Sequence, residues 1–253
     1  MQTSSHMTEA SRMTLDTITR ALQTKQHPIW AFLEKAPLNA GQFSRFRDDY
    51  LYMTQNTAAC IASYYSNLIR EENYEVLSLI MDNLTDETAR GTPHALLMYE
   101  AFNILAGKLG VARVDRVREV TPSHSARCFQ VVQNEVFRSS KIGFQTGFYL
   151  AHEMHADVML RTVGKQFILH DITHKYFIEH SGEHFTGGVE EHHYTDGYKV
   201  CVKLGLSADE ILEAVRYYDH IRSRVWDTML HDLVAAGGNS GDRAKFSASR
   251  PDR

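Results

Sequence analysis

The amino-acid sequence predicts an all-α protein, a compact bundle of about seven to nine helices. Apolar residues recur at helical spacing along almost the whole chain, which is typical of amphipathic helices packed around one core. Only five prolines and fifteen glycines interrupt the 253 residues. The one β-rich run, at 111–117, lies between two predicted helices and no partner strand follows it.

The N-terminal part predicts a short helix followed by a long one. An apolar stripe at 15–22 precedes the segment 27–30, whose proline breaks the stripe and leads into a short apolar turn. Asn39 is the expected N-cap of the next helix, with Gln42 at its N3 position. An aromatic-rich stripe then predicts one long amphipathic helix over 42–70.

The rest of the chain predicts a succession of helices with short connections. Ser207 and Glu210 form the capping box that is expected to open the last one. The predicted segments are 73–90, 93–110, 124–138, 142–162, 166–180, 189–204 and 208–234.

One domain is expected, because neither an internal repeat nor an interdomain linker divides the chain. A chain of this length can bury a large core without disulfides. The polar ends are expected to be disordered. The domain then covers 13–235, with a disordered N-terminus at 1–12 and a disordered tail at 236–253.

Composition narrows the classes of partner and the compartment. The formal net charge is −4 and the basic residues are scattered, so neither nucleic acid nor an anionic membrane is an expected partner. Three cysteines without a CxxC motif, Cys60, Cys128 and Cys201, are typical of a reduced cytoplasmic protein. No apolar run reaches the ~18 residues of a membrane span, and the N-terminal residues lack the apolar stretch of a signal peptide.

Glu87 and His94 are the first candidates for chemistry. Glu87 continues an apolar face that begins at Leu77, and a carboxylate on such a face is costly unless it is paired or bound to a metal. His94 follows on the same face after Pro93, which bends the helix or starts a new one. The alternative is a hydrogen-bonded buried glutamate beside a core histidine.

A second inward carboxylate lies in the helix predicted over 142–162. Glu153 interrupts its apolar strip, and His152 and His155 lie on an adjacent strip. One inward glutamate is weak evidence by itself, so its meaning depends on the neighbouring segments.

The segment 176–193 holds the densest cluster of ligand-type residues. His180 ends one helical run, a glycine-rich insert follows, and a new helix begins with Glu190 and His193 on its apolar face. The alternative is a solvated histidine-rich loop. A second strip of the new helix is wholly polar and is expected to face solvent; it holds His192, Asp196, Lys199 and Lys203.

Three carboxylates and three imidazoles therefore form the candidate ligand set. They suit two iron or manganese ions bridged by a carboxylate, and the lack of a thiolate argues against a structural zinc site. The set is Glu87, His94, Glu153, His180, Glu190 and His193. The reserve pairs are His192 with Asp196 and Asp171 with His174.

Several of these stretches resemble the heme-oxygenase-like diiron oxidases, relatives of the thiaminase TenA and of the chlamydial CADD protein. The resemblance covers about His27 to Leu233. Its landmarks are the HPIW segment, the aromatic helix over 42–70 and the stretch 83–102, in which Glu87 and His94 match the family's glutamate and histidine.

The resemblance also covers part of the later ligands. Glu153 corresponds to the family's second glutamate, and the YFxxH motif ends at His180. The family then places an aspartate and a histidine where this chain has His184 and Gly187. The acid-x-x-His element reappears only after the insert, at 190–193.

The resemblance implies a heme-oxygenase-like fold and an oxidative function. Enzymes of the family bind Fe(II), react with O₂ and oxidise amino acids or fatty acids, by N-oxygenation, oxidative C–C or C–N cleavage, or nitrile formation. For this chain it implies two iron ions, as Fe(II) and Fe(III), with O₂ as co-substrate. We expect the substrate to be a small molecule, an amino acid. An external electron donor and a homodimer are further expectations.

Three alternatives remain open at this point. A metal-free TenA-like hydrolase needs a nucleophilic cysteine near a carboxylate, and neither Cys60 nor Cys128 lies in such a motif. A heme oxygenase needs a proximal histidine near the N-terminus, but Pro28 after His27 is poor context for it. A non-enzymatic protein that binds metal through its histidine-rich segment would need no O₂ chemistry.

Overall fold

The computed structural model describes residues 14–88, 92–181 and 189–238, without the side chains of 181–191. Within these ranges there is no strand, so the all-α prediction is confirmed. They form eleven α-helices, α2 to α12, and three short 3-10 helices. None of these helices is long and apolar enough to cross a membrane. The ends that were expected to be disordered lie outside the described residues, except that α12 continues to Ala236.

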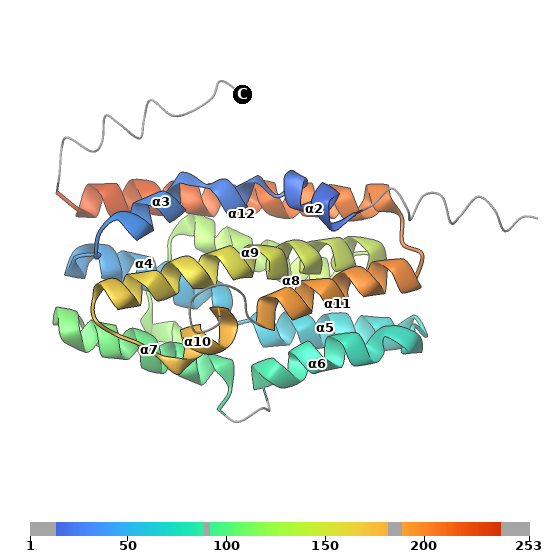
Figure 1. The fold of residues 1–253 in the computed structure, drawn as a ribbon, viewed down its shortest axis with the longest axis horizontal. Helices are drawn as coiled ribbons and strands as arrows, with labels where there is room; N and C mark the ends of the chain where they lie inside the picture. The colour runs from blue at the N-terminus through green and yellow to red at the C-terminus, as the bar shows by residue number, and fades with distance from the viewer. Residues whose placement is uncertain (1–13, 89–91, 182–188, 239–253) are drawn as a thin grey trace, which may run out of the picture.

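Helices at the N-terminus lie along the last helix. The helices α2 (Leu15–Ala21) and α3 (Pro28–Lys35) pack on α12 (Ala208–Ala236) at the upper edge of Figure 1. The segment that was expected to be a turn instead starts α3, because a proline at the first helical position needs no hydrogen-bond acceptor.

The long helix predicted over 42–70 divides into two, which is one reason for the higher helix count. Its parts are α4 (Ala40–Thr54) and α5 (Thr57–Arg70), and the backbone leaves the helical conformation at Asn56. The capping box of Asn39 and Gln42 is present at the start of α4. At α12 only half of the expected box is present: Ser207 Oγ accepts from the Glu210 amide.

The remaining helices follow the predicted order with shifted ends, except that the helix predicted over 166–180 is divided: its first residues end the preceding helix at Leu169, and a separate helix begins at Lys175. Pro93 starts a new helix rather than bending an old one, and the helix predicted to end at 162 continues by seven residues. The bounds are α6 (Leu77–Thr88), α7 (His94–Leu109), α8 (His124–Ser139), α9 (Ile142–Leu169), α10 (Lys175–Ser181) and α11 (Val189–Lys203).

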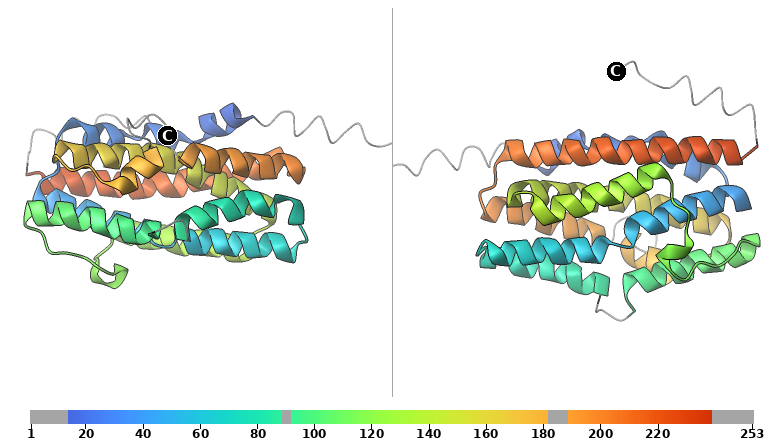
Figure 2. Two further views of the ribbon diagram at one scale, coloured as in Figure 1. Left: turned by 60° about the horizontal axis from the view of Figure 1, so that its bottom comes forward. Right: turned by 180° about the vertical axis from the view of Figure 1, so that it is seen from behind.

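Helix α9 runs through the middle of the bundle. It contacts α3, α5, α8, α10, α11 and α12, and the views of Figures 1 and 2 agree on its central place. Side chains on every side of α9 are buried between Ile142 and Phe167. Most of α9 is therefore part of the core, so that His152, Glu153 and His155 lie inside the protein, whereas Lys165 near its end is exposed.

Two glycines allow helices to approach α9 closely. A Cβ atom at Gly147 of α9 would lie 2.6 Å from the Ile211 carbonyl oxygen of α12. A Cβ atom at Gly197 of α11 would lie 2.9 Å from the ring of Tyr149 in α9. The hydroxyl of Tyr149 in turn accepts a hydrogen bond of 2.6 Å from Asn83 of α6. These contacts fix α6 and α11 against α9.

Charged residues of α4 hold the segment that precedes α8. Arg47 Nη1 donates to the Ala112 carbonyl at 2.6 Å, and its Nη2 lies 2.9 Å from Asp48 Oδ1. The other oxygen of Asp48 accepts from the Thr121 amide at 3.0 Å. The guanidinium thus has both a carboxylate and a backbone carbonyl as partners.

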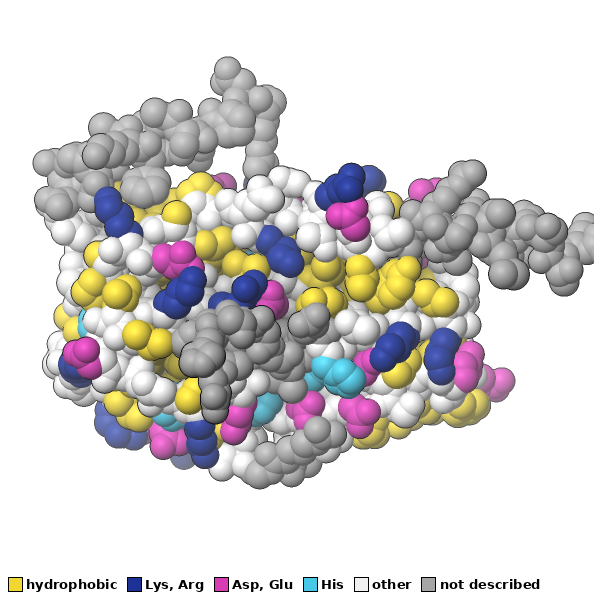
Figure 3. All heavy atoms as spheres, in the orientation of Figure 1, with side chains coloured by type: hydrophobic (Ala, Val, Ile, Leu, Met, Phe, Trp, Pro, Cys, Tyr) yellow, Lys and Arg dark blue, Asp and Glu magenta, His cyan; other side chains and the backbone are white. Residues whose placement is uncertain are grey.

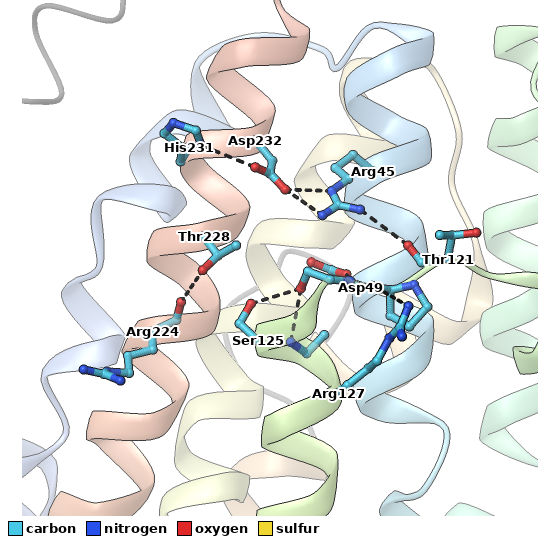
Figure 4. Close-up of polar contacts among 12 residues, drawn as sticks. Arg45, Asp49, Thr121, Ser125, Arg127, Arg224, Thr228, His231 and Asp232 are labelled. Atoms are coloured by element: carbon cyan, nitrogen blue, oxygen red, sulfur yellow. Dashed lines mark hydrogen bonds and ion pairs between the residues drawn. The ribbon is translucent and has the colours of Figure 1, made fainter.

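The same surface of α4 reaches α12 (Figure 4). Arg45 Nε donates to Asp232 at 2.8 Å, and the carboxylate of buried Asp49 accepts from the Ser123 amide at 2.5 Å. Burial raises the pKa of the Asp49 carboxyl. We call this group the α4 clamp; its members are Arg45, Arg47, Asp48 and Asp49.

Candidate metal centre

The first half of the candidate site combines one carboxylate and two imidazoles from three helices. Glu87 is near the end of α6, His94 is the first residue of α7, and His180 lies in α10. Each offers a ligand atom, and these atoms all lie within 4.8 Å of one another. Glu87 Oε1 is 3.4 Å from His94 Nδ1.

The tautomer of His180 follows from its backbone contact. Its Nδ1 lies 2.6 Å from the Tyr176 carbonyl oxygen, and a carbonyl can only accept. Nδ1 therefore carries the proton and Nε2 holds the lone pair. A histidine that binds a metal through one nitrogen commonly donates its other N–H to a carbonyl or carboxylate in this way.

The second half of the candidate site is built around His193 of α11. Its Nε2 is 3.2 Å from Asp86 Oδ2 in α6, and its Nδ1 is 3.6 Å from Glu153 Oε2 in α9. All three residues are buried. Glycine at 197, one helical turn further along α11, allows this helix to bring the imidazole between the two carboxylates.

A cavity of about 60 Å³ joins the two halves. Its walls include Glu87, His94 and His180 from the first half and Glu153 from the second, together with His152. Sulfur and alkyl groups form much of the remaining wall, from Met98, Ala156, Met159 and Leu160. The candidate ligands therefore face a small space with an apolar lining.

Burial keeps two imidazoles of this region, His180 and His152, neutral at pH 7. Burial, together with the nearby His94, lowers the pKa of His180 from 6.5 to about 4. Burial also lowers the pKa of His152. Neutral imidazole is the form that binds a metal, so these side chains need not lose a proton at neutral pH.

The structure brings five of the six predicted ligands to this region. Glu87, His94 and His180 form the first half; Glu153 and His193 belong to the second. The sixth, Glu190, lies on the backbone of α11, but its side chain is outside the described residues.

The reserve pairs do not lie in the cluster. The side chain of His192 is 60% exposed, and histidine and acidic side chains gather on the surface around the start of α11 (Figure 3). Asp196 is buried, which corrects the prediction that its strip faces solvent throughout. It contacts His192 at 3.3 Å and Lys199 at 2.6 Å.

The other reserve pair, Asp171 and His174, lies beside α7. The exposed carboxylate of Asp171 is 3.3 Å from Lys108, and His174 is 3.9 Å from Glu100. His155 of α9 is a core residue: its Nε2 accepts from Trp226 Nε1 at 2.9 Å. These contacts are structural.

Asp86 is the residue that the sequence reasoning missed. The predicted apolar face of α6 passed through Leu84 to Glu87, but the buried residues of this helix are Ile80, Asn83 and Asp86. The available signal was the three-residue spacing from Ile80, which leads through Asn83 to Asp86.

Two alternatives lose support from local chemistry. Burial raises the pKa values of Cys60 and Cys201 to about 12, which opposes the thiolate that a cysteine hydrolase needs, and Cys128 is exposed. Both ring nitrogens of His27 are engaged. Its Nδ1 accepts from the Ile29 amide at 3.2 Å, and its Nε2 is 3.3 Å from Asp227, so His27 is poorly placed to bind heme iron.

Comparison with known proteins defines the fold. No family model and no curated protein matches the sequence. Solved structures do match: a domain of unknown function with a heme oxygenase-like fold from Shewanella denitrificans superposes with a TM-score of 0.65. That pair is 12% identical, over 93% of this chain and 97% of the other. The chain therefore has a heme-oxygenase-like fold, as its resemblance implied.

A second match carries a more specific description. It is a CADD-like protein of unknown function from Nostoc punctiforme, with a TM-score of 0.63 and 17% identity. The match covers 87% of this chain and 97% of that one. At this identity the likeness establishes the shared fold, and the activity must be argued from the side chains.

Proposed function

We propose that this chain is an O₂-dependent non-heme diiron oxidase or oxygenase that acts on a small organic substrate, an amino acid. One observation carries the proposal: ligand atoms of Glu87, His94 and His180 meet within 4.8 Å inside the bundle. The cluster of Asp86, Glu153 and His193 lies on the same helices or their neighbours.

The donor atoms fit iron better than the common alternatives. Imidazole nitrogen and carboxylate oxygen suit iron or manganese, whereas structural zinc sites usually include thiolate. Glu87, His94 and His180 would hold one ion. Glu153 and His193 would hold the other, with either Asp86 or Glu190 as a further carboxylate.

The side chains would prepare the site in three ways. Buried carboxylates offset the charge of metal cations, and the Tyr176 carbonyl orients His180 with its Nε2 available. The small cavity would limit the room for water beside the metal ligands. Iron, when bound, supplies the electrons that activate O₂.

The test begins with metal binding in the absence of O₂. Anaerobic titration with Fe(II) is expected to give about two ions per chain. His94→Ala should lower this number, whereas His192→Ala, a histidine on the exposed side of α11, should not. Asp86→Asn and Glu190→Gln, compared side by side, will identify the further carboxylate ligand.

Activity is tested next with the iron-loaded protein. Exposure to O₂ with a panel of amino acids and fatty acids, followed by mass spectrometry, should reveal gain of oxygen or loss of the carboxyl group. Binding of two irons without O₂ consumption would support a metal-binding protein instead. Failure to bind iron would overturn the proposal.

A further inference from the structure

Arg222 of α12 is a buried cation, and no carboxylate of the described residues pairs with it. Its side chain is 1% exposed. Its Nη1 donates to Met53 Sδ at 3.4 Å and its Nη2 to Met159 Sδ at 3.3 Å, while Nε has no hydrogen-bond partner in the described part of the chain. The guanidinium also stacks over two rings, at 4.4 Å from Phe129 and 4.6 Å from Trp226.

These contacts only partly compensate a buried guanidinium. Thioether sulfur is a weak acceptor, and aromatic rings attract the cation but accept none of its five N–H groups in strong hydrogen bonds. The acidic groups that influence Arg222 are the phenols of Tyr50 and Tyr218, which are uncharged at neutral pH. The site therefore keeps a positive charge that an incoming anion could neutralise.

Arg47 shows how this chain satisfies a buried arginine for structural purposes. Its guanidinium has the Asp48 carboxylate at 2.9 Å and the Ala112 carbonyl at 2.6 Å. Arg222 is more deeply buried than Arg47, at 1% against 6% exposure, yet the described residues offer it neither a carboxylate nor a carbonyl partner. A stabilising role alone does not account for this difference.

The place of Arg222 connects it to the candidate metal centre. Met159, which accepts from its Nη2, also lines the cavity that Glu87, Glu153 and His180 face. One flexible methionine side chain thus separates the guanidinium from the cavity, and methionine changes rotamer at little cost. His152 lines the same cavity, and its Nδ1 is buried without a hydrogen-bond partner among the described residues.

We propose that Arg222 binds the carboxylate of the substrate, with Met159 and Met53 moving aside to admit it. This inference rests on the proposed function, because it takes the cavity lined by the proposed metal ligands as the place of reaction. The substrate would lie with its carboxylate on α12 and its reacting end toward Glu87, His94 and His180.

The chemistry of the site favours a monocarboxylate over a phosphate. A planar guanidinium matches a carboxylate in two parallel hydrogen bonds. A single cation among thioethers and rings balances one negative charge, whereas a phosphate dianion would leave a second charge buried without compensation. The cavity wall is otherwise largely apolar, which suits an amino acid or fatty acid with an aliphatic chain.

The test measures binding of paired probes to the full chain, both metal-free in a chelator and loaded with Mn(II). The pairs are leucine with leucinamide and hexanoate with hexanamide. Within each pair, the second compound has a neutral amide in place of the carboxylate. Trp226 stacks on the guanidinium and is one of only two tryptophans, so its fluorescence reports on the site. We expect the acids to bind saturably and the amides not to bind.

Variants assign this binding to Arg222. Arg222→Met should weaken acid binding by about thirtyfold or more, which is the loss for one partner of a buried charge pair. Arg222→Lys keeps the charge but lacks the planar fork, so it should bind with intermediate affinity. Arg47→Met is the matched control and should bind acids like the unchanged protein; equilibrium dialysis with labelled acid avoids any change in tryptophan emission.

Stability separates a binding role from a structural one. Urea unfolding should give an Arg222→Met midpoint equal to or above that of the unchanged protein, whereas Arg47→Met should lower the midpoint. The proposal is overturned if Arg222→Met binds the acids normally, or if acids and amides bind equally. Acid binding through Arg222 without metal binding would refute the proposed function alone; Mn(II) binding without acid binding would refute this inference alone.

Discussion

The α4 clamp and the candidate metal centre both bury charged groups, but they do so differently. In the clamp, Arg47 meets Asp48, and the acids of α4 accept from the backbone amides of Thr121 and Ser123. In the candidate metal centre, Glu87 lies beside the imidazole of His94, and burial lowers the pKa of nearby His180 to about 4.

This difference indicates what each region is for. Complementary charges and backbone amides satisfy the clamp within the protein, so it fastens the segment before α8. The candidate metal centre instead places carboxylates next to imidazoles, and both are kinds of group that bind metal cations. The predictions below test this distinction, beginning with the largest effect.

Breaking the clamp should cost the most stability. Arg47→Met is expected to lower the free energy of unfolding by about 3–5 kcal/mol, because Asp48 then stays largely buried without its cation. Glu87→Gln in the metal-free protein should change the free energy of unfolding by less than about 1 kcal/mol, because glutamine keeps the shape of the side chain and removes its negative charge. Urea denaturation at pH 7 measures both, and equal losses would erase the distinction between the regions.

The buried imidazole of His180 should make the metal-free protein acid-sensitive. Its folded-state pKa lies below the unfolded value, so the unfolded state takes up the proton first as the pH falls. The stability is complete above pH 6.5 and declines toward about pH 4, by about 3 kcal/mol for this group.

The variant His180→Gln isolates that contribution. Burial also lowers the pKa of His155, so protonation of this histidine destabilises the unchanged protein and the variant alike as the pH falls. The free energies of unfolding of the two proteins should therefore diverge only below pH 6.5. In that range the free energy of unfolding of the unchanged protein should fall more steeply with pH than that of the variant. Parallel curves from pH 7 to pH 4 would contradict the lowered pKa of His180.

Metal should stabilise the centre and leave the clamp unaffected. Mn(II), which avoids reaction with O₂, is expected to add about 2.7 kcal/mol per site at a concentration of 100 Kd. For a chain of this size that corresponds to roughly 5–10 °C in Tm per site. His94→Ala should remove much of this shift, and His231→Ala, beside Asp232 near the clamp, should keep it. A chelator should reverse the shift.

The smallest effect is expected on the exposed side of α11. His192→Ala should change stability by less than about 1 kcal/mol, because its side chain is 60% exposed and Asp196 retains Lys199 at 2.6 Å. The Mn(II) dissociation constant should change by less than about twofold, which calorimetry can measure. A larger loss of metal affinity would restore His192 as a ligand.

Helical spacing was enough to predict the fold class and the inward direction of several ligands. The periodicity placed His94 and Glu153 on buried faces and Glu87 at the half-buried edge of one, because an amphipathic helix turns its apolar side to the core. It also predicted correctly that His193, rather than His192, points inward on α11.

The missing information lay in contacts between helices. Asn83 counted as polar in the sequence, but it is buried because it donates to Tyr149, and its spacing reveals Asp86. Asp196 was expected to face solvent, but it is buried, and its ion pairs are with His192 and Lys199 of its own helix. Arg222 was not singled out, because a lone arginine on an apolar helix face carries no motif. Such partners exist only after the chain has folded.

The glycine at position 197 has a consequence for how the site could be altered. It is the contact at which α11 rests on the Tyr149 ring, and a methyl group there would meet the ring at 2.9 Å. Alanine would push the helix outward and carry the His193 imidazole with it, while Glu87, His94 and His180 stand on other helices. One added carbon atom would in this way disturb the second of the two proposed ion sites and leave the ligands of the first in place.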